Sequence, residues 1–156
     1  IKPFNKIIRM FVFTISFKRN IMARTFDIQL PHYPRGYHLI TQEIISRLPR
    51  LPEHGLLLAF IKHTSSALTL NENADPDVRH DFTTFFDKIV PDGMTGFRHT
   101  LEGPDDMSAH IKASLLGASV MIPIKDYKLN LGTWQGIYLC EFRNGGDKRK
   151  ISITIL

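Results

Sequence analysis

The C-terminal stretch GIYLCEFRNGGDKRKISITIL, residues 136–156, decides the fold class. Its two apolar runs, residues 136–143 and 149–156, are rich in the β-branched and aromatic residues typical of strands. Between them lies Asn144-Gly145-Gly146-Asp147, and paired glycines favour a tight turn. The pattern predicts an antiparallel hairpin at the end of the chain, which argues against a doubly wound parallel sheet.

Upstream of this stretch, short strands are interspersed with helices. Apolar alternation or short apolar runs predict strands at residues 25–30, 37–40, 55–63, 67–71 and 119–124. Helical spacing predicts helices at residues 41–48, from Asp75-Pro76 to Ile89, and from Pro104 through Met107, Ile111 and Leu115 to a stop at Gly117. With about seven strands and three helices, we expect an α+β fold: a mainly antiparallel β-sandwich with the helices packed outside, in a single domain.

Charge is distributed unevenly along the chain. The formal net charge is +5, but residues 1–24 hold six of the twenty basic side chains and no acid. Residues 25–156 therefore carry fourteen basic against fifteen acidic side chains. Nucleic-acid binding needs a basic surface to neutralise phosphates. A nearly neutral domain excludes nucleic acid as the expected partner.

Residues 1–21 are interpreted as a basic N-terminal extension, and residues 22–156 as the domain. Met22 is a candidate start, and the apolar stretch at residues 10–17 is too short to cross a bilayer. The extension fits an organellar targeting peptide and a non-native addition equally well. The single cysteine, Cys140, excludes an intrachain disulfide and favours a packed thiol in a reducing compartment. We therefore expect a cytoplasmic protein without membrane attachment.

The stretch HTLEGPDDMSAH, residues 99–110, gathers imidazoles and carboxylates around a predicted helix start. Asp106 and His110 are four residues apart and share one helical face, while His99 and Glu102 lie in the preceding loop. Histidines with carboxylates form a ligand set for zinc, manganese or a similar divalent metal, although the spacing matches no strict motif. The alternative is that the acids only complement the helix dipole.

Two other polar groups lie next to predicted strands. In one, His63 ends an apolar strand, and Asn71 and Glu72 follow the next one as a candidate orienting amide and general acid or base. In the other, LGTWQG at residues 131–136 offers Thr133 and Gln135 to a phosphate or a flat ring, with Arg143 as a candidate anion partner. The alternatives are loop formation for Asn71 and Glu72, a core anchor before the next strand for Trp134, and a solvated surface charge for Arg143. No P-loop, dinucleotide fingerprint or nucleophile elbow occurs in the sequence.

Four ordered segments carry a resemblance to a known family. They are RGYHLIT (35–41), KHTSSALTLNENADPDVRHDF (62–82), FRHTLEGPDDMSAHIKASLLG (97–117) and LGTWQGIYLCEFRNGGDKRKI (131–151). Residues 22–156 resemble the YjbQ-like family, also called the secondary thiamine-phosphate synthase family. The tail EFRNGGDKRK departs from the glycine-proline-arginine version common in relatives.

The resemblance implies a β-rich sandwich assembled as a homotrimer. It also implies that His63, His99 and His110 gather at a pocket that binds a divalent metal ion, zinc or magnesium/manganese. Members form thiamine phosphate weakly, by joining a pyrimidine methyl diphosphate to a thiazole phosphate.

We therefore expect a small metal-assisted enzyme that acts on a phosphorylated small molecule. Its catalytic residues would be Glu72, Glu102 and Asp106, and its substrate-binding residues would be Asn71, Thr133, Gln135 and Arg143. The competing hypothesis is a non-catalytic metabolite- or metal-binding module.

Overall fold

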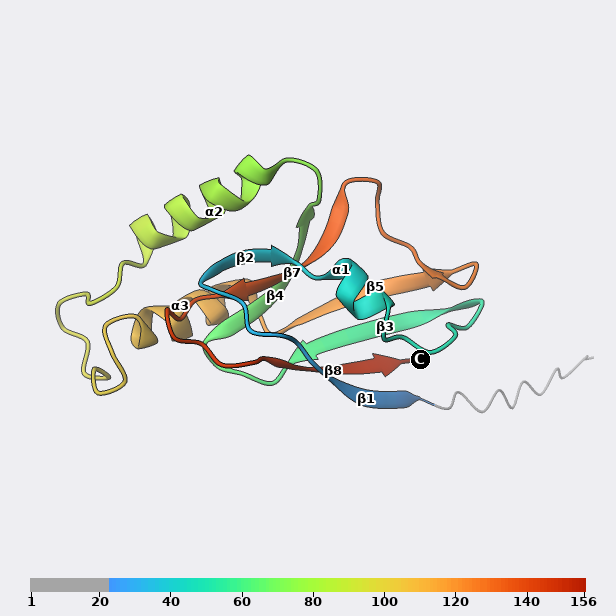
Figure 1. Ribbon diagram of the computed structural model, residues 1–156, viewed down its shortest axis with the longest axis horizontal. Helices are drawn as coiled ribbons and strands as arrows, with labels where there is room; N and C mark the ends of the chain where they lie inside the picture. The colour runs from blue at the N-terminus through green and yellow to red at the C-terminus, as the bar shows by residue number, and fades with distance from the viewer. Residues whose placement is uncertain (1–22) are drawn as a thin grey trace, which may run out of the picture.

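The computed structural model describes residues 23–156, which form two antiparallel sheets and three helices (Figure 1). The predicted N-terminal extension, residues 1–21, lies outside the described residues. The five-stranded sheet has the order β1 (Arg24–Gln29), β8 (Lys150–Ile155), β3 (His54–Ile61), β5 (Ser119–Lys125) and β6 (Lys128–Leu129). The three-stranded sheet has the order β2 (Gly36–Leu39), β7 (Gln135–Glu141) and β4 (Ser66–Glu72). The helices are α1 (Thr41–Ile45), α2 (Pro76–Ile89) and α3 (Asp106–Leu116).

Two apolar cores divide the molecule into three layers. The first core lies between the sheets and includes Leu57, Ile122, Ile137 and Ile153. The second lies between the three-stranded sheet and helices α2 and α3. Strand β7 contributes to both cores, because Ile137 and Leu139 face the first and Tyr138 and Cys140 face the second. The three-stranded sheet is therefore covered on both faces.

Within residues 23–156, the five-stranded sheet is covered on one face only. In β5, Val120, Ile122 and Ile124 are buried and the alternate residues are exposed, as expected when successive side chains point to opposite faces. The outward-facing Met121 of β5 is 60% exposed, and Phe60 of β3 is 45% exposed. The outer face of this sheet thus presents large apolar side chains.

The predicted fold class is confirmed, and so is the start of α2. Asp75 is the N-cap of this helix, where its Oδ1 accepts a hydrogen bond from the Asp77 amide at 2.8 Å. The start of α3 was wrong by two residues, because the helix begins at Asp106 and Pro104 lies in the loop. The buried face of this helix also differs from the one predicted from the spacing of its large apolar residues. Ala109, Lys112 and Ala113 are buried, whereas Leu115 is 60% exposed.

The predicted C-terminal hairpin is wrong. Strand β7 lies in the centre of the three-stranded sheet, where β2 and β4 occupy both of its edges, so no edge is free for β8. Strand β8 instead pairs with β1 and β3 in the other sheet. Residues 142–149 therefore cross from one sheet to the other. Cys140 is fully buried, as predicted for a packed thiol, and burial raises the pKa of this thiol well above its usual range.

An ionic network fixes the long loop between α2 and α3. Arg35 pairs with Asp87 of α2 at 2.7 Å and with Asp92 of the loop at 2.5 Å. Lys112 of α3 is buried and reaches Asp87 at 2.5 Å, while Ser108 donates to Asp92 at 2.5 Å. These contacts hold the loop between Arg35 and α3, and the chain then turns back to the start of α3 (Figure 1). No helix in the described part of the chain is long and apolar enough to span a membrane.

Candidate functional site

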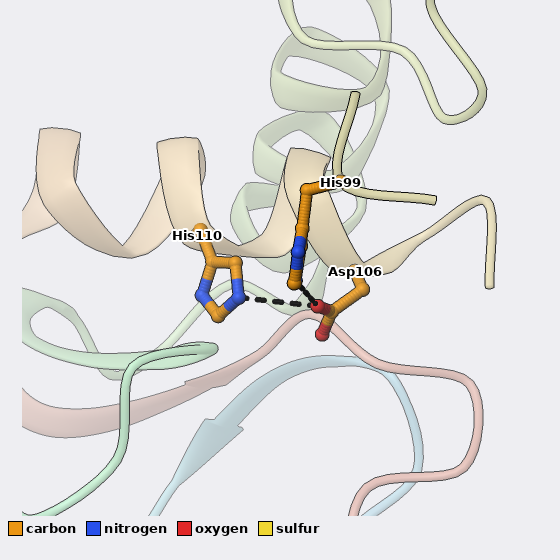
Figure 2. A group of neighbouring side chains, drawn as sticks. All are labelled: His99, Asp106 and His110. Carbon is orange, nitrogen blue, oxygen red and sulfur yellow. Dashed lines mark hydrogen bonds and ion pairs between the residues drawn. The ribbon is translucent and has the colours of Figure 1, made fainter. Parts of the chain in front are cut away.

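His99, Asp106 and His110 meet at the first turn of α3 (Figure 2). His99 Nε2 lies 2.7 Å from Asp106 Oδ2, and His110 Nε2 lies 3.1 Å from the same oxygen. The Asp106 carboxylate is 2% exposed, whereas the two imidazoles are 47% and 30% exposed. The three ligand atoms lie within 4.8 Å of one another, so they could hold one metal ion. Two residues of α3, spaced by one helical turn, and one loop residue thus converge on a single point.

The hydrogen bonds of His110 constrain its proton. His110 Nδ1 lies 3.0 Å from the carbonyl oxygen of Thr64, and a carbonyl only accepts, so Nδ1 carries a proton. In a neutral imidazole the lone pair on Nε2 then faces the Asp106 carboxylate at 3.1 Å. A cation bound between Nε2 and the carboxylate would satisfy both lone pairs, and an Nδ1–H bonded to a backbone carbonyl is typical of metal-ligating histidines.

Arg143 holds the carboxylates of the two adjacent residues Asp105 and Asp106. Its Nη1 is in contact with Asp106 Oδ1, and its Nε lies 3.3 Å from Asp105 Oδ2. Although burial acts to raise the pKa of Asp105, the backbone amide of Asn144 and the Arg143 guanidinium hold it below its usual range. Arg143 was predicted to bind substrate, but these contacts make it a support of the histidine cluster.

His63 does not join the cluster. Its Nε2 accepts a hydrogen bond from the Lys150 amide at 2.8 Å, and its Nδ1 lies 3.3 Å from Arg149 Nη1. Both ring nitrogens therefore face the start of β8 rather than Asp106. The neighbouring Thr64 links the two groups, because its carbonyl accepts from His110. His63 thus lies beside the candidate metal centre without contributing a ligand to it.

A large open cavity begins at this point. Its volume is about 980 Å³, and it lies between the end of β3, the turn into β4 and the last turns of α3. The polar residues that line it include His63, Thr64, Ser65, Ser66, Ser114 and Arg149. Since Thr64 lines the cavity and binds His110, the cavity adjoins the histidine cluster. A small-molecule substrate has room there.

The other predicted residues gather at the opposite end of the three-stranded sheet. Strand β4 begins at Ser66 opposite Glu141 and ends at Glu72 opposite Gln135, so its ends are roughly 20 Å apart at 3.3 Å per residue. Asn73 joins this group by donating to the carbonyl oxygens of Thr133 and Gln135 at 3.3 Å and 3.0 Å. Within one chain, Asn71, Glu72, Thr133 and Gln135 are thus remote from His99 and His110.

Among these remote residues, several polar atoms serve local structure. Asn71 Oδ1 accepts from the Glu72 amide at 2.8 Å, and Gln135 Oε1 accepts from the Gly132 amide at 2.8 Å. Trp134 is 65% exposed, so it is not the core anchor that was weighed against a binding role. Glu102 belongs to the histidine end: its carbonyl accepts from Arg143 at 2.7 Å, and its side chain is 65% exposed at the rim.

Sequence reasoning assigned Asp106 only to orienting His110 and catalysis, and it noted the polar run His63-Thr64-Ser65-Ser66 at the end of a strand without giving Ser66 a role of its own. The spacing of Asp106 and His110 was a usable signal, because residues four apart on a helix share a face. The contact between His99 and Asp106 could not be predicted from the sequence, because it depends on the path of the loop between α2 and α3. Arg149 gave no signal within its basic run, DKRK.

Comparison with known proteins places the chain and its fold in a family. The sequence profile described as "UPF0047 protein YjbQ-like" matches residues 26–156. The chain belongs to this family. The UPF0047 protein YjbQ of Salmonella typhimurium is 52% identical over 130 residues, covering 82% of this chain and 94% of that protein. The YjbQ protein of Escherichia coli O157:H7 is 48% identical over 123 residues, covering 78% and 88%.

Solved structures of similar proteins share the fold. A conserved hypothetical protein from Thermus thermophilus has a TM-score of 0.75 at 30% identity, covering 84% of this chain and 99% of that one. An uncharacterized YjbQ/UPF0047 protein from Clostridium acetobutylicum has a TM-score of 0.70 at 37% identity, covering 84% and 99%. The YjbQ-like family is thus a family of unknown function, and its members share the single α+β domain described here.

The support that Arg143 gives to this YjbQ-like site is measurable as stability. Arg143→Met leaves two buried carboxylates without their cation, so we expect the free energy of unfolding to fall by about 3 kcal/mol. Urea unfolding followed by circular dichroism measures the change. The matched control is Arg47→Met, which removes an exposed pair with Glu43 and should cost less than about 1 kcal/mol. Equal losses in the two variants would contradict the role given to Arg143.

Proposed function

We propose that the protein is a metal-assisted enzyme that acts on a phosphorylated small molecule. The observation that carries the proposal is the shared Asp106 carboxylate, with His99 Nε2 and His110 Nε2 both beside one oxygen. Two imidazole nitrogens and one carboxylate oxygen suit zinc or manganese and leave coordination positions open. A divalent cation held there would supply positive charge to a phosphate or diphosphate leaving group.

The chain's own residues would prepare this site. Thr64 fixes the ring of His110 through its carbonyl, and Arg143 fixes the carboxylate of Asp106. The Thr64 contact involves Nδ1 of His110 and the Arg143 contact involves Oδ1 of Asp106. A cation would therefore have to replace only the contacts that His99 Nε2, His110 Nε2 and Asp106 Oδ2 make with one another. The only cysteine is fully buried, so covalent catalysis by a thiol is not part of the proposal.

The family resemblance supports a more specific reaction, the weak formation of thiamine phosphate. In this reaction a pyrimidine methyl diphosphate is joined to a thiazole phosphate, and diphosphate leaves as the new bond forms. Both reactants are phosphorylated heterocycles, and the adjoining cavity of about 980 Å³ has room for molecules of this size. Glu102, exposed at the rim of the cluster, is the acid or base candidate of the same chain.

Metal binding is the first expected outcome. The native protein should bind one zinc or manganese ion per chain, and His99→Ala and His110→Ala should each weaken binding at least about tenfold, because each removes a ligand. Metal analysis and titration calorimetry measure both. His54→Ala, an exposed histidine remote in sequence, is the matched control. His63→Gln should keep the metal, because His63 lies outside the cluster.

Retained metal in the His99→Ala and His110→Ala double variant would rule out the proposed centre. Loss of metal in His63→Gln would restore His63 to the ligand set and overturn its placement here.

Turnover is the second expected outcome. The metal-loaded protein should couple the pyrimidine methyl diphosphate to the thiazole phosphate above the rate of metal alone. Glu102→Gln should lower kcat about tenfold or more, because Glu102 is the acid or base candidate of this site. Product formation measured by mass spectrometry tests this. Tight ligand binding without turnover would instead favour the non-catalytic binding module.

We also propose a homotrimer. Two observations support assembly: the outer face of the five-stranded sheet exposes Phe60 and Met121, and the two polar ends of the other sheet lie roughly 20 Å apart. A neighbouring copy could bring its Glu72 and Gln135 to the histidine cluster, which one chain alone does not do.

Native mass spectrometry of the chain from Met22 should therefore give three times the chain mass. Met121→Asp places a charge on the exposed apolar face and should shift the population towards monomer. Lys88→Asp, at an exposed position of α2 away from this sheet face, is the charge-changing control and should leave the trimer intact. A monomeric native protein would contradict the assembly without affecting metal binding.

A further inference from the structure

Arg149 lines the cavity, and two of its three guanidinium nitrogens are held by Glu141. The residue is 7% exposed, and its Nε and Nη2 donate to the two oxygens of Glu141, each at 2.6 Å. Nη2 also donates to Ser65 Oγ at 3.3 Å. The remaining nitrogen, Nη1, has only His63 Nδ1 beside it, at 3.3 Å. The guanidinium is thus fixed on Glu141 through Nε and Nη2, while Nη1 faces only His63, and the residue lines the cavity.

His63 faces Arg149 with a donor of its own. Because His63 Nε2 accepts from the Lys150 amide, the proton of the neutral imidazole is on Nδ1. Burial and the Arg149 charge lower the pKa of His63, which keeps the ring neutral. Nδ1–H and the Nη1–H groups are therefore two sets of donors that face each other, with no acceptor between them.

Ser66 adds a third unsatisfied group. It is 1% exposed and lines the same cavity, and its Oγ has no hydrogen-bond partner. Among the described residues, only the hydroxyl of Tyr37 shares this condition. A buried hydroxyl without a partner is costly, so such groups often mark a place where a ligand or water binds.

The charge of the cavity wall points to the same kind of ligand. Lys62 and Arg149 line the cavity, and none of the described residues that line it is acidic. N–H and O–H donors that line one cavity beside a fixed guanidinium suit an oxyanion, because guanidinium donors match phosphate oxygens.

We propose that Arg149, His63 and Ser66 form an oxyanion subsite that binds the phosphoryl group of the substrate beside the candidate metal centre. This inference rests on the proposed function for the identity of the substrate, but the donors themselves do not depend on the metal. The subsite would hold a phosphate oxygen with Arg149 Nη1, His63 Nδ1 and Ser66 Oγ. The resulting position, next to Thr64, places the anion close to His110.

Binding of inorganic pyrophosphate to the metal-free protein tests the subsite. Titration calorimetry in the presence of a chelator should detect binding to the native protein. Ser66→Ala and Arg149→Lys should each weaken it about tenfold or more, because each removes a donor to a charged group. Ser66→Ala should leave the melting temperature unchanged, because its Oγ has no partner to lose.

Ser114→Ala is the matched control. Ser114 lines the same cavity, but its hydroxyl already donates to the carbonyl oxygen of His110 at 2.9 Å, so pyrophosphate binding should not change. Arg149→Lys removes part of the pairing of Glu141, which could prevent folding. In that case the pyrophosphate affinity of the folded Ser66→Ala variant still tests the subsite. Native affinity in Ser66→Ala, or no binding of pyrophosphate by the native protein, overturns the subsite.

The His99→Ala and His110→Ala double variant separates this inference from the proposed function. It should lose the metal and still bind pyrophosphate in the chelated buffer with native affinity. Loss of pyrophosphate binding in this variant would mean that the anion contacts the histidine cluster instead of Arg149. A native protein that binds pyrophosphate but no metal would contradict the proposed metal centre and leave the subsite standing.

Discussion

The burial of the three-stranded sheet on both faces is the constraint on which the remaining structure depends. With the five-stranded sheet on one side and α2 and α3 on the other, the middle of β7 has room only for apolar side chains. Polar chemistry is therefore confined to the ends of β4 and β7. One end holds the turn into β4 beside α3, and the other holds Glu72 opposite Gln135. The separation of the two polar groups follows directly from this packing.

Buried carboxylates then determine where the arginines lie. Glu141 ends β7 at 1% exposure, and a buried charge is tolerated only when it is paired, so Arg149 is drawn against it. Asp105 and Asp106 are buried in the same way at the start of α3, and Arg143 pairs with both. These pairs form because buried carboxylates need a cation. They also position the candidate site, because Arg143 holds Asp106 and Arg149 lies beside His63.

Local patterns predicted most of the elements but not their pairing. The alternation in β5 and the start of α2 at Asp75-Pro76 could be predicted from the sequence, because each depends only on neighbouring residues. The hairpin prediction failed because a glycine-rich turn signal does not reveal whether a strand edge is already occupied. At the site, the spacing of Asp106 and His110 was readable from the helical period. The roles of His63 and Arg143 were not, since His63 contacts Arg149 and Arg143 contacts Asp106, and each pair joins segments far apart in the sequence.

The crossing between the sheets explains why the two arginines serve different groups. In a hairpin, β8 would pair with β7, and the residues on either side of the turn would lie side by side. Here residues 142–149 leave the three-stranded sheet and enter the other one. Arg143 leaves β7 beside α3 and supports Asp106, while Arg149 precedes β8 and reaches His63 at the end of β3. The two supported groups meet at Thr64, whose carbonyl binds His110 and whose neighbour is His63. The crossover segment therefore connects a candidate cation site to a candidate anion site, which is the combination that a phosphorylated substrate requires.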